Sequence, residues 1–239
     1  MKYIYGPVQS RRLGLSLGIS LTPHKVCQFD CVYCQLGATT LKTAERSAYA
    51  PSAEVLAELR SWLDTNPQDL KTLSFITLAG AGEPTLHPEI ALIIAKIKEM
   101  SGVPAAVITN SCLLGDAAVR KELLQADLII PSLDAAIPEV FAKINRPVPG
   151  VKIEDIIEGL VNLRKEYRGK VWLEIMLVKG YNDDIRHIRK LKEAIERINP
   201  DKIQLNSPVR STTEKDISAS DKDKLEQIKE LLGEKAEIV

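Results

Sequence analysis

The sequence predicts an α/β protein whose parallel strands and outer helices form a partial (β/α)6 barrel. Segments with the period of a strand alternate with segments of helical period six times along the chain. Such alternation is typical of a parallel sheet with right-handed crossovers. Six units are too few to close a standard eight-stranded barrel, so we expect an open one. The 239 residues contain no internal repeat or linker, which predicts a single domain over 1–239.

Each element of this fold is predicted from its own periodicity. Residues 13–21 read L-G-L-S-L-G-I-S-L, a strict period of two and therefore a strand. Five further strands are expected at 72–79, 105–109, 128–133, 171–178 and 202–206. Helical spacing between and after these strands predicts helices at 53–63, 88–100, 116–125, 153–166, 184–198 and 220–232.

The two faces of the predicted strands differ in character. In the first strand the leucines and the isoleucine point one way, and Gly14, Ser16, Gly18 and Ser20 point the other. Helices must cover the apolar face, so the small and polar face should line the lumen. A packed barrel interior needs bulky branched residues, so this lining predicts a hollow that holds a ligand. The alternative is that individual polar residues are hydrogen-bonded structural groups. The same division places Ser132 with Asp134, Glu174 with Trp172 and Met176, and Gln204 with Asn206.

The overall composition is typical of a cytoplasmic enzyme. Thirty-two basic and thirty-two acidic residues cancel, so no global positive field attracts nucleic acid, although a local basic rim could still bind it. No stretch approaches the ~20 apolar residues that span a bilayer. Residues 1–12 lack a secretory signal, and four cysteines do not suggest a disulfide framework. We therefore expect no membrane association.

Three cysteines, Cys27, Cys31 and Cys34, share one short segment with the spacing C-x3-C-x2-C. Thiolates this close together can converge on one metal centre, and three of them leave a four-iron cluster one ligand short. A metal without a full set of protein ligands has an open, reactive position. The alternatives are a zinc knuckle or a disulfide. Zinc requires a closed set of four ligands, and the remaining cysteine, Cys112, is far along the chain.

This spacing resembles the signature of the radical S-adenosylmethionine (radical SAM) enzymes. The resemblance implies that Cys27, Cys31 and Cys34 hold a [4Fe-4S] cluster whose fourth iron binds the amino and carboxylate groups of S-adenosylmethionine. In that family the cysteine loop follows the first strand of a partial barrel, and here it follows residues 13–21. The family usually has an aromatic residue before the last cysteine. Tyr33 occupies that place, and its backbone would meet the adenine.

Further positions match the family's cofactor site. The family's G-G-E-P motif after the second strand appears here as A-G-E-P, so Gly82 and Glu83 are expected to contact the methionine ammonium. Asn110, Ser132 and Asp134 match positions of ribose-contacting groups at the ends of the third and fourth strands. The ends of the fifth and sixth strands are expected to complete the adenosine pocket; they include Lys179 and Asn206.

A narrower resemblance lies upstream. Residues 6–14 read G-P-V-Q-S-R-R-L-G, similar to the G-P-V-P-S-R-R-L-G of a radical SAM branch grouped with wyosine-forming tRNA enzymes. Residues 82–86 and 178–183 also fit that branch. Gln9 replaces its proline, and the chain lacks the further cysteines that wyosine enzymes use for a second cluster. The resemblance therefore implies the branch without establishing the wyosine substrate.

The chemistry implied by the family needs an external electron donor such as flavodoxin or ferredoxin. The reduced cluster cleaves S-adenosylmethionine to methionine and a 5′-deoxyadenosyl radical, which abstracts hydrogen from a substrate that we expect to be a small molecule or a nucleotide. Competing hypotheses are a glycyl-radical-enzyme activase, a wyosine-type tRNA enzyme, and a non-catalytic iron–sulfur or zinc module.

Two further features are expected near the mouth of the barrel. Five basic residues on predicted loops could bind a phosphate or carboxylate or simply be solvated: Arg11, Arg12, Lys25, Lys179 and Arg210. Cys112 follows the third strand and is expected beside the reaction chamber as a buried structural thiol. A fourth cluster ligand and a hydrogen donor are its alternative roles.

Overall fold

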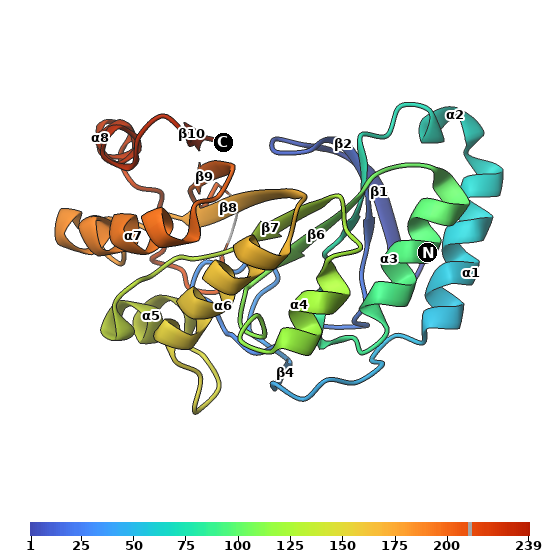
Figure 1. Ribbon diagram of the computed structural model, residues 1–239, viewed down its shortest axis with the longest axis horizontal. Helices are drawn as coiled ribbons and strands as arrows, with labels where there is room; N and C mark the ends of the chain where they lie inside the picture. The colour runs from blue at the N-terminus through green and yellow to red at the C-terminus, as the bar shows by residue number, and fades with distance from the viewer. Residues whose placement is uncertain (210–211) are drawn as a thin grey trace.

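A computed structural model describes residues 1–209 and 212–239 and confirms the α/β class (Figure 1). Its main sheet has eight strands in the order β1-β2-β5-β6-β7-β8-β9-β10. The six predicted strands form its centre and pair in parallel, as expected for a partial barrel. Their bounds are β2 Gly14–Ile19, β5 Phe75–Leu78, β6 Ala105–Thr109, β7 Leu128–Pro131, β8 Lys170–Met176 and β9 Lys202–Asn206.

The sheet carries an additional strand at each edge that the periodicity did not predict. β1 (Ile4–Ser10) pairs antiparallel with β2, and β10 (Ala236–Ile238) pairs parallel with β9. Gly6 and Pro7 interrupt β1, and proline is confined to edge strands or bulges because it cannot donate to the ladder. β10 is too short for a periodic pattern. A separate two-stranded sheet joins β3 (Val26–Cys27) to β4 (Leu41–Lys42); residues 26–42, which include the three cysteines, are called the cysteine loop below.

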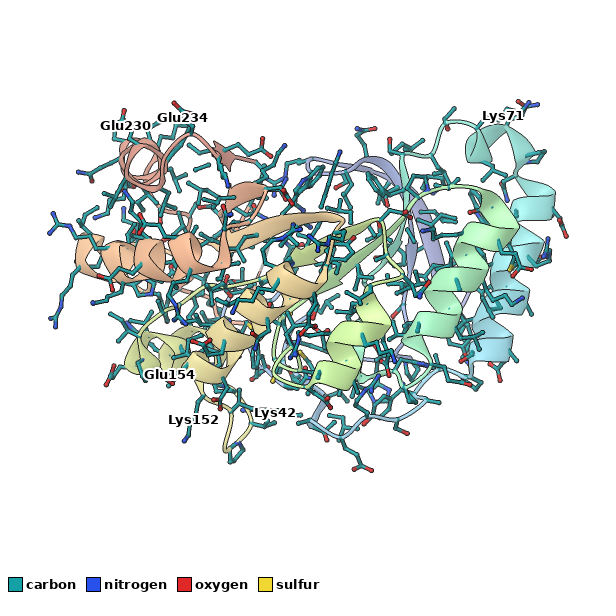
Figure 2. The ribbon with its side chains drawn as sticks, viewed as in Figure 1. Lys42, Lys71, Lys152, Glu154, Glu230 and Glu234 are labelled. Atoms are coloured by element: carbon teal, nitrogen blue, oxygen red, sulfur yellow. The ribbon has the colours of Figure 1, made fainter. Side chains whose placement is uncertain are left out.

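The outer helices follow one another along one face of the sheet (Figure 1). Six match the predictions: α1 Ser52–Thr65, α3 Ile90–Ser101, α4 Ala117–Leu123, α6 Ile153–Glu166, α7 Ile185–Ile198 and α8 Lys222–Leu232. Three short helical segments were not predicted: α2 Pro67–Leu70, η1 Pro84–Leu86 and α5 Pro138–Asn145. Labelled charged side chains such as Lys71, Glu154 and Glu230 are exposed at the surface (Figure 2). No helix among the described residues is long and apolar enough to cross a bilayer.

The outer face of the sheet is the apolar one, as predicted. Leu17, Ile19, Leu173 and Leu205 are completely or almost completely buried in one large core together with the inward faces of the helices. Burying a side chain of this kind contributes about 1.5–3 kcal/mol. This core holds the strands in their curved arrangement and so fixes the relative positions of the loops at their carboxyl ends.

The inner face differs from the prediction at one end. A second apolar cluster lies on the face opposite the helices, on residues that come before the carboxyl ends of the central strands; its members are Leu13, Phe75, Ala106, Ile108, Leu128, Ile130 and Trp172. We call this cluster the floor. The expectation of a small and polar lumen holds at Ser16 and Thr77, whose hydroxyls lie 2.6 Å apart. It is wrong for the floor, because the apolar side chains of this cluster pack against one another and fill the space there.

Arg11 and Arg12 occupy the turn between β1 and β2 and contact the far strands of the sheet. Arg12 Nη1 donates to the Glu174 carboxylate on β8, and Arg11 Nη2 donates to Asn206 Oδ1 on β9 at 2.9 Å. We expected each arginine either to bind an anion or to be solvated. Arg11 is exposed, but both side chains also donate to other strands of the sheet. They link the antiparallel hairpin at one edge of the open barrel to the strands near the other edge.

Candidate functional site

The segment after β2 lies against the carboxyl ends of the central strands. The Glu83 N–H donates to the Val26 carbonyl at 3.0 Å, which ties this segment to the loop after β5. On the opposite side, the Val148 N–H donates to the Gln28 carbonyl at 2.9 Å. The Val32 N–H donates to the Ile144 carbonyl of α5 at 3.0 Å. The cysteines are therefore displayed by a loop that several elements hold in place.

The three cysteines are half-buried, and two of them receive hydrogen bonds from carboxamides. Asn110 Nδ2 donates to Cys27 Sγ at 3.2 Å, and Asn145 Nδ2 donates to Cys31 Sγ at 3.4 Å. Burial raises the pKa of the Cys27 thiol to about 12 and also raises that of Cys31. Bound metal would reverse this effect, because a coordinating thiol is deprotonated. Within the described part of the chain, no three His, Cys, Asp or Glu side chains form a site for a single metal ion.

Gly82 lies in close contact with the cysteine loop. A Cβ at this position would lie 2.2 Å from the Val26 carbonyl oxygen and 2.7 Å from Thr22 Oγ1. Neither distance is compatible with a side chain, and the first involves backbone. A glycine at position 82 is therefore required by packing against the cysteine loop.

The Glu83 carboxylate is buried and accepts hydrogen bonds on both oxygens. Oε1 accepts from Thr85 Oγ1 at 2.7 Å and from Thr109 Oγ1 at 2.6 Å, while Oε2 accepts from the Asn110 N–H at 2.7 Å. Burial raises the pKa of Glu83, and these hydrogen bonds oppose the rise. Glu83 thus joins the loop after β5 to the end of β6. A contact with the methionine ammonium remains a prediction.

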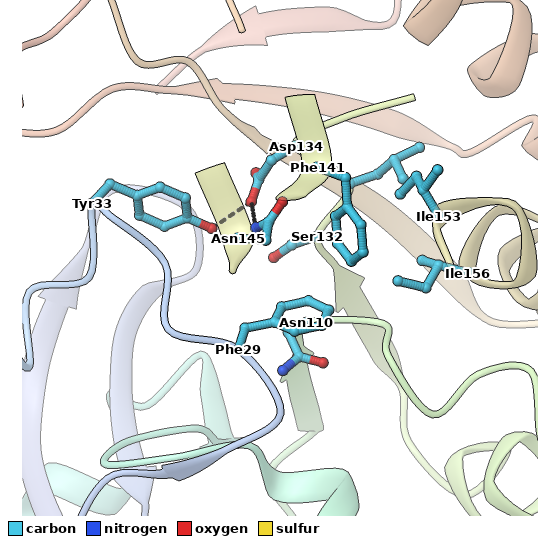
Figure 3. A pocket seen from close by; sticks show the side chains of 10 residues that line it. Phe29, Tyr33, Asn110, Ser132, Asp134, Phe141, Asn145, Ile153 and Ile156 are labelled. Atoms are coloured by element: carbon cyan, nitrogen blue, oxygen red, sulfur yellow. Dashed lines mark hydrogen bonds between the residues drawn. The ribbon is translucent and has the colours of Figure 1, made fainter. Parts of the chain in front are cut away.

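Asp134 is the centre of a second buried network (Figure 3). Its Oδ2 accepts from the Tyr33 hydroxyl and from Asn145 Nδ2, the latter at 2.7 Å, and its Oδ1 accepts from the Met176 N–H at 2.9 Å. Burial raises the pKa of Asp134. Sequence reasoning missed Asn145, which touches both Asp134 and Cys31, because it belongs to α5, an element without a clear periodic signal.

Four of the predicted cofactor residues meet at one pocket. Tyr33, Asn110, Ser132 and Asp134 line it together with Phe29, Leu133, Phe141, Asn145, Ile153 and Ile156 (Figure 3). Asn206 is not among these lining residues. It is buried, donates to Glu174 Oε1 at 3.1 Å and accepts from Arg11. Its predicted place in an adenosine pocket therefore has no support from the pocket lining.

The remaining predicted cations and Cys112 have simple surroundings. Lys25 is buried, donates to the Gly37 carbonyl and lies 3.5 Å from Asp30 Oδ1, so it is a structural residue rather than a free cation. Lys179 is exposed and pairs with Asp221 at 2.8 Å. Arg210 lies outside the described residues. Cys112 is half-buried, and burial, with the Glu83 and Cys27 charges, raises its pKa to about 12.

In the segment that follows β2, two buried polar atoms have no hydrogen-bond partner among the described residues: Thr22 Oγ1 and Gln28 Nε2. Leaving such a group unpaired costs about 1–3 kcal/mol, which favours a bound group that supplies the missing partner. Three thiols without disulfide partners lie in the same segment. These residues fit a thiolate-bound iron–sulfur cluster with a polar cofactor beside it.

Comparison with known proteins identifies the family. The Radical SAM superfamily model matches residues 21–192, more than half of the chain, so this protein belongs to that superfamily. A UPF0026 protein of Methanocaldococcus jannaschii, MJ1312, is 33% identical over 239 residues, 100% of this chain and 73% of its own length. A protein named GTPase Obg from Brachyspira hyodysenteriae is 36% identical over 95% of this chain, and the matched region covers only 33% of that protein's length. A GTP 3′,8-cyclase of Limosilactobacillus fermentum is 30% identical over 77% of this chain and 51% of its own length.

Solved structures support the fold. A radical SAM methyltransferase from Sphaerobacter thermophilus is 17% identical with a TM-score of 0.72, covering 94% of this chain and 65% of its own. A structure of TYW1 with a lysine-pyruvate adduct bound is 23% identical with a TM-score of 0.60, covering 91% of this chain and 72% of its own. These likenesses establish the partial barrel. As a radical SAM protein, this chain is an enzyme that uses a [4Fe-4S] cluster and S-adenosylmethionine.

Proposed function

We propose that Cys27, Cys31 and Cys34 hold the [4Fe-4S] cluster and that the protein is a radical SAM enzyme acting on a small molecule or nucleotide. When bound and reduced, these cofactors yield methionine and a 5′-deoxyadenosyl radical that removes hydrogen from the substrate. The observation that carries this proposal is the set of side-chain amides directed at two of the three thiols, Asn110 at Cys27 and Asn145 at Cys31. Amide donors to coordinating sulfur are a regular part of the surroundings of such clusters.

The other site residues then divide by position. Gly82 allows the cysteine loop to approach the end of β5, and Glu83, next to it, holds the methionine end of S-adenosylmethionine. Tyr33, Asn110, Ser132 and Asp134 surround the adenosine end, because they share one pocket. The floor excludes water from the opposite end of the lumen, which protects a reactive radical.

The substrate class is proposed from a sequence segment, from relatives and from net charge. The G-P-V-Q-S-R-R-L-G segment and the likeness to TYW1 favour the branch grouped with wyosine enzymes. Three of the four cysteines are assigned to one cluster, so a second cluster of the wyosine type lacks ligands. The balanced net charge does not favour tRNA, and the relative named as a GTP cyclase makes a nucleotide a reasonable class to screen. A glycyl-radical activase is the second candidate on size and cysteine spacing.

The remaining features follow from the chemistry. One electron comes from a donor such as flavodoxin or ferredoxin. A thiolate-bound cluster is stable in a reducing compartment, so we place the enzyme in the cytoplasm. Residues 1–239 act as one radical SAM domain in this proposal.

Anaerobic reconstitution tests the proposal. We expect about four irons and four sulfides per chain, and release of 5′-deoxyadenosine on addition of dithionite and S-adenosylmethionine. Cys27→Ala, Cys31→Ala and Cys34→Ala should each abolish that release, and Cys112→Ala, the matched control, should keep both iron and release. Zinc without iron in the purified protein, or deoxyadenosine release from a Cys27→Ala protein, would contradict the assignment. Loss of the cluster in Cys112→Ala would instead make that residue a ligand.

A further inference from the structure

Gln28 lies between the first two cysteines of the loop and is completely buried. Its backbone carbonyl accepts from the Val148 N–H, and its side-chain Oε1 accepts from Asn110 Nδ2 at 2.9 Å. Among the residues that the structure describes, its side-chain Nε2 has no hydrogen-bond partner. A fully buried amide with one end bonded and one donor unpaired is unusual, since nearly all buried polar groups in proteins are paired.

The orientation of this amide follows from its neighbours. The Cys112 N–H donates to Asn110 Oδ1 at 2.9 Å, so Oδ1 must be the acceptor end of Asn110 and Nδ2 the donor end. Asn110 Nδ2 then donates toward Cys27 Sγ and Gln28 Oε1. Turning the Gln28 amide over would bring two NH₂ groups together. The free donor of Gln28 is therefore fixed by a chain of hydrogen bonds that begins at a backbone amide.

We propose that Gln28 Nε2 donates a hydrogen bond to the iron–sulfur cluster, beside Cys27, and thereby sets its reduction potential. This inference rests on the proposed cysteine ligands. Asn110 Nδ2 donates to the Cys27 sulfur and to Gln28 Oε1, so the Gln28 side-chain amide is held beside the group that already contacts a proposed cluster ligand. Gln28 is a positioning and tuning residue and takes no part in bond breaking.

Electrostatics gives the direction of the effect. Reduction adds one electron to the cluster, and an N–H dipole directed at its sulfur stabilises the added negative charge. The interaction is stronger in a buried site than in water. Removing the donor should therefore make the cluster harder to reduce while leaving its iron content unchanged.

The test is a redox titration of the reconstituted protein, monitored by electron paramagnetic resonance without S-adenosylmethionine. In Gln28→Leu we expect the ratio of reduced to oxidised cluster at a fixed potential to fall about tenfold, a shift of about 59 mV to lower potential for a one-electron couple. Gln28→Glu keeps an acceptor for Asn110 and lacks the free amide donor, so it should also shift to lower potential. The matched control is Gln204→Leu, since Gln204 is also fully buried but lies on β9. It should leave the potential unchanged.

Several outcomes would overturn the inference. An unchanged reduction potential in both Gln28 variants would show that Gln28 does not tune the cluster. A weaker affinity for S-adenosylmethionine at unchanged potential would mean that Gln28 binds the cofactor instead. Loss of iron from both folded variants would make Gln28 necessary for assembly and not for tuning. Failure of the wild-type protein to assemble a four-iron cluster would contradict the proposed function itself and is therefore distinguishable.

Discussion

The two ends of the lumen use the same strands in opposite ways. At the mouth, the carboxyl ends of β5, β6 and β7 lead to Glu83, Asn110 and Asp134, which are connected by hydrogen bonds to the cysteine loop. At the floor, residues that come before the carboxyl ends of these strands, Phe75, Ile108 and Ile130, belong to one apolar cluster. Along one face of the same strand, the side chains thus change from apolar packing to polar contacts within a few residues.

This difference separates two kinds of sensitivity. The floor is stabilised by apolar burial, which tolerates changes of shape but penalises lost volume. The mouth depends on close approach between backbone segments and on complete hydrogen bonding of buried groups. There, one added side-chain atom, or one acceptor replaced by a donor, removes a required contact. Substitutions at the mouth should therefore alter cofactor binding, and those at the floor should alter stability.

The largest effect is expected for Gly82→Ala at the mouth. Its new Cβ would lie 2.2 Å from the Val26 carbonyl oxygen, so the cysteine loop must move away from β5. We expect loss of most of the iron after reconstitution, measured by iron and sulfide analysis. Ala81→Gly, at the neighbouring position, is the control and should load iron normally. Full iron content in Gly82→Ala would show that the loop adjusts without cost to the cluster.

The next effect is at the floor, where Ile130→Ala removes a fully buried side chain. Such a truncation costs about 2–5 kcal/mol of unfolding free energy. Denaturant unfolding measures this loss, and the affinity of the folded protein for S-adenosylmethionine should not change. Ile129→Ala, on the outer face of the same strand, should cost a similar amount. A large loss of cofactor affinity in Ile130→Ala would contradict the claim that substitutions at the floor change stability alone.

A smaller effect is expected for Glu83→Gln. Glutamine has only one side-chain oxygen, and its NH₂ group cannot accept a hydrogen bond. Either the Thr109 hydroxyl or the Asn110 N–H therefore loses its acceptor. The expected cost is about 1–3 kcal/mol of stability. Calorimetry should also show weaker binding of S-adenosylmethionine with the cluster spectrum intact. Glu237→Gln, a distant carboxylate, is the control. Equal cofactor affinity in Glu83→Gln and wild type would mean that the pocket is misplaced.

The smallest effect is expected for an ion pair between two outer helices, α4 and α6. Arg120 donates to both Glu166 oxygens at 2.9 Å and to the Leu114 carbonyl at 2.8 Å. The Arg120 guanidinium lowers the pKa of Glu166, so this pair stabilises the fold above the usual glutamate pKa and less as pH falls through the lowered value. Because Glu166 is partly exposed, Glu166→Gln should cost under about 1 kcal/mol at pH 7. The thermal unfolding temperatures of the two proteins should differ at pH 7 and converge at an acidic pH below the lowered pKa of Glu166. A constant difference at both pH values would exclude the ion pair as its cause.

Periodicity predicted the six central strands and six helices because each buries one face, and burial leaves a repeat in the sequence. β1 and α5 escaped prediction for local reasons. Gly6 and Pro7 disturb the alternation in β1, and α5 has no clear periodic signal. The omission of α5 also hid Asn145, whose contacts with Asp134 and Cys31 join the two halves of the site.

The sequence by itself determined the α/β class, the cysteine spacing and the order of the motifs, since these depend on local pattern alone. Only the tertiary structure decided that Arg11 and Arg12 reach β8 and β9, that the lumen has an apolar floor, and that Asn206 lies outside the pocket lining. It also decided which end of the Gln28 amide is free. Contacts of this kind join residues far apart in the chain, and their geometry depends on how all the strands curve and pack together.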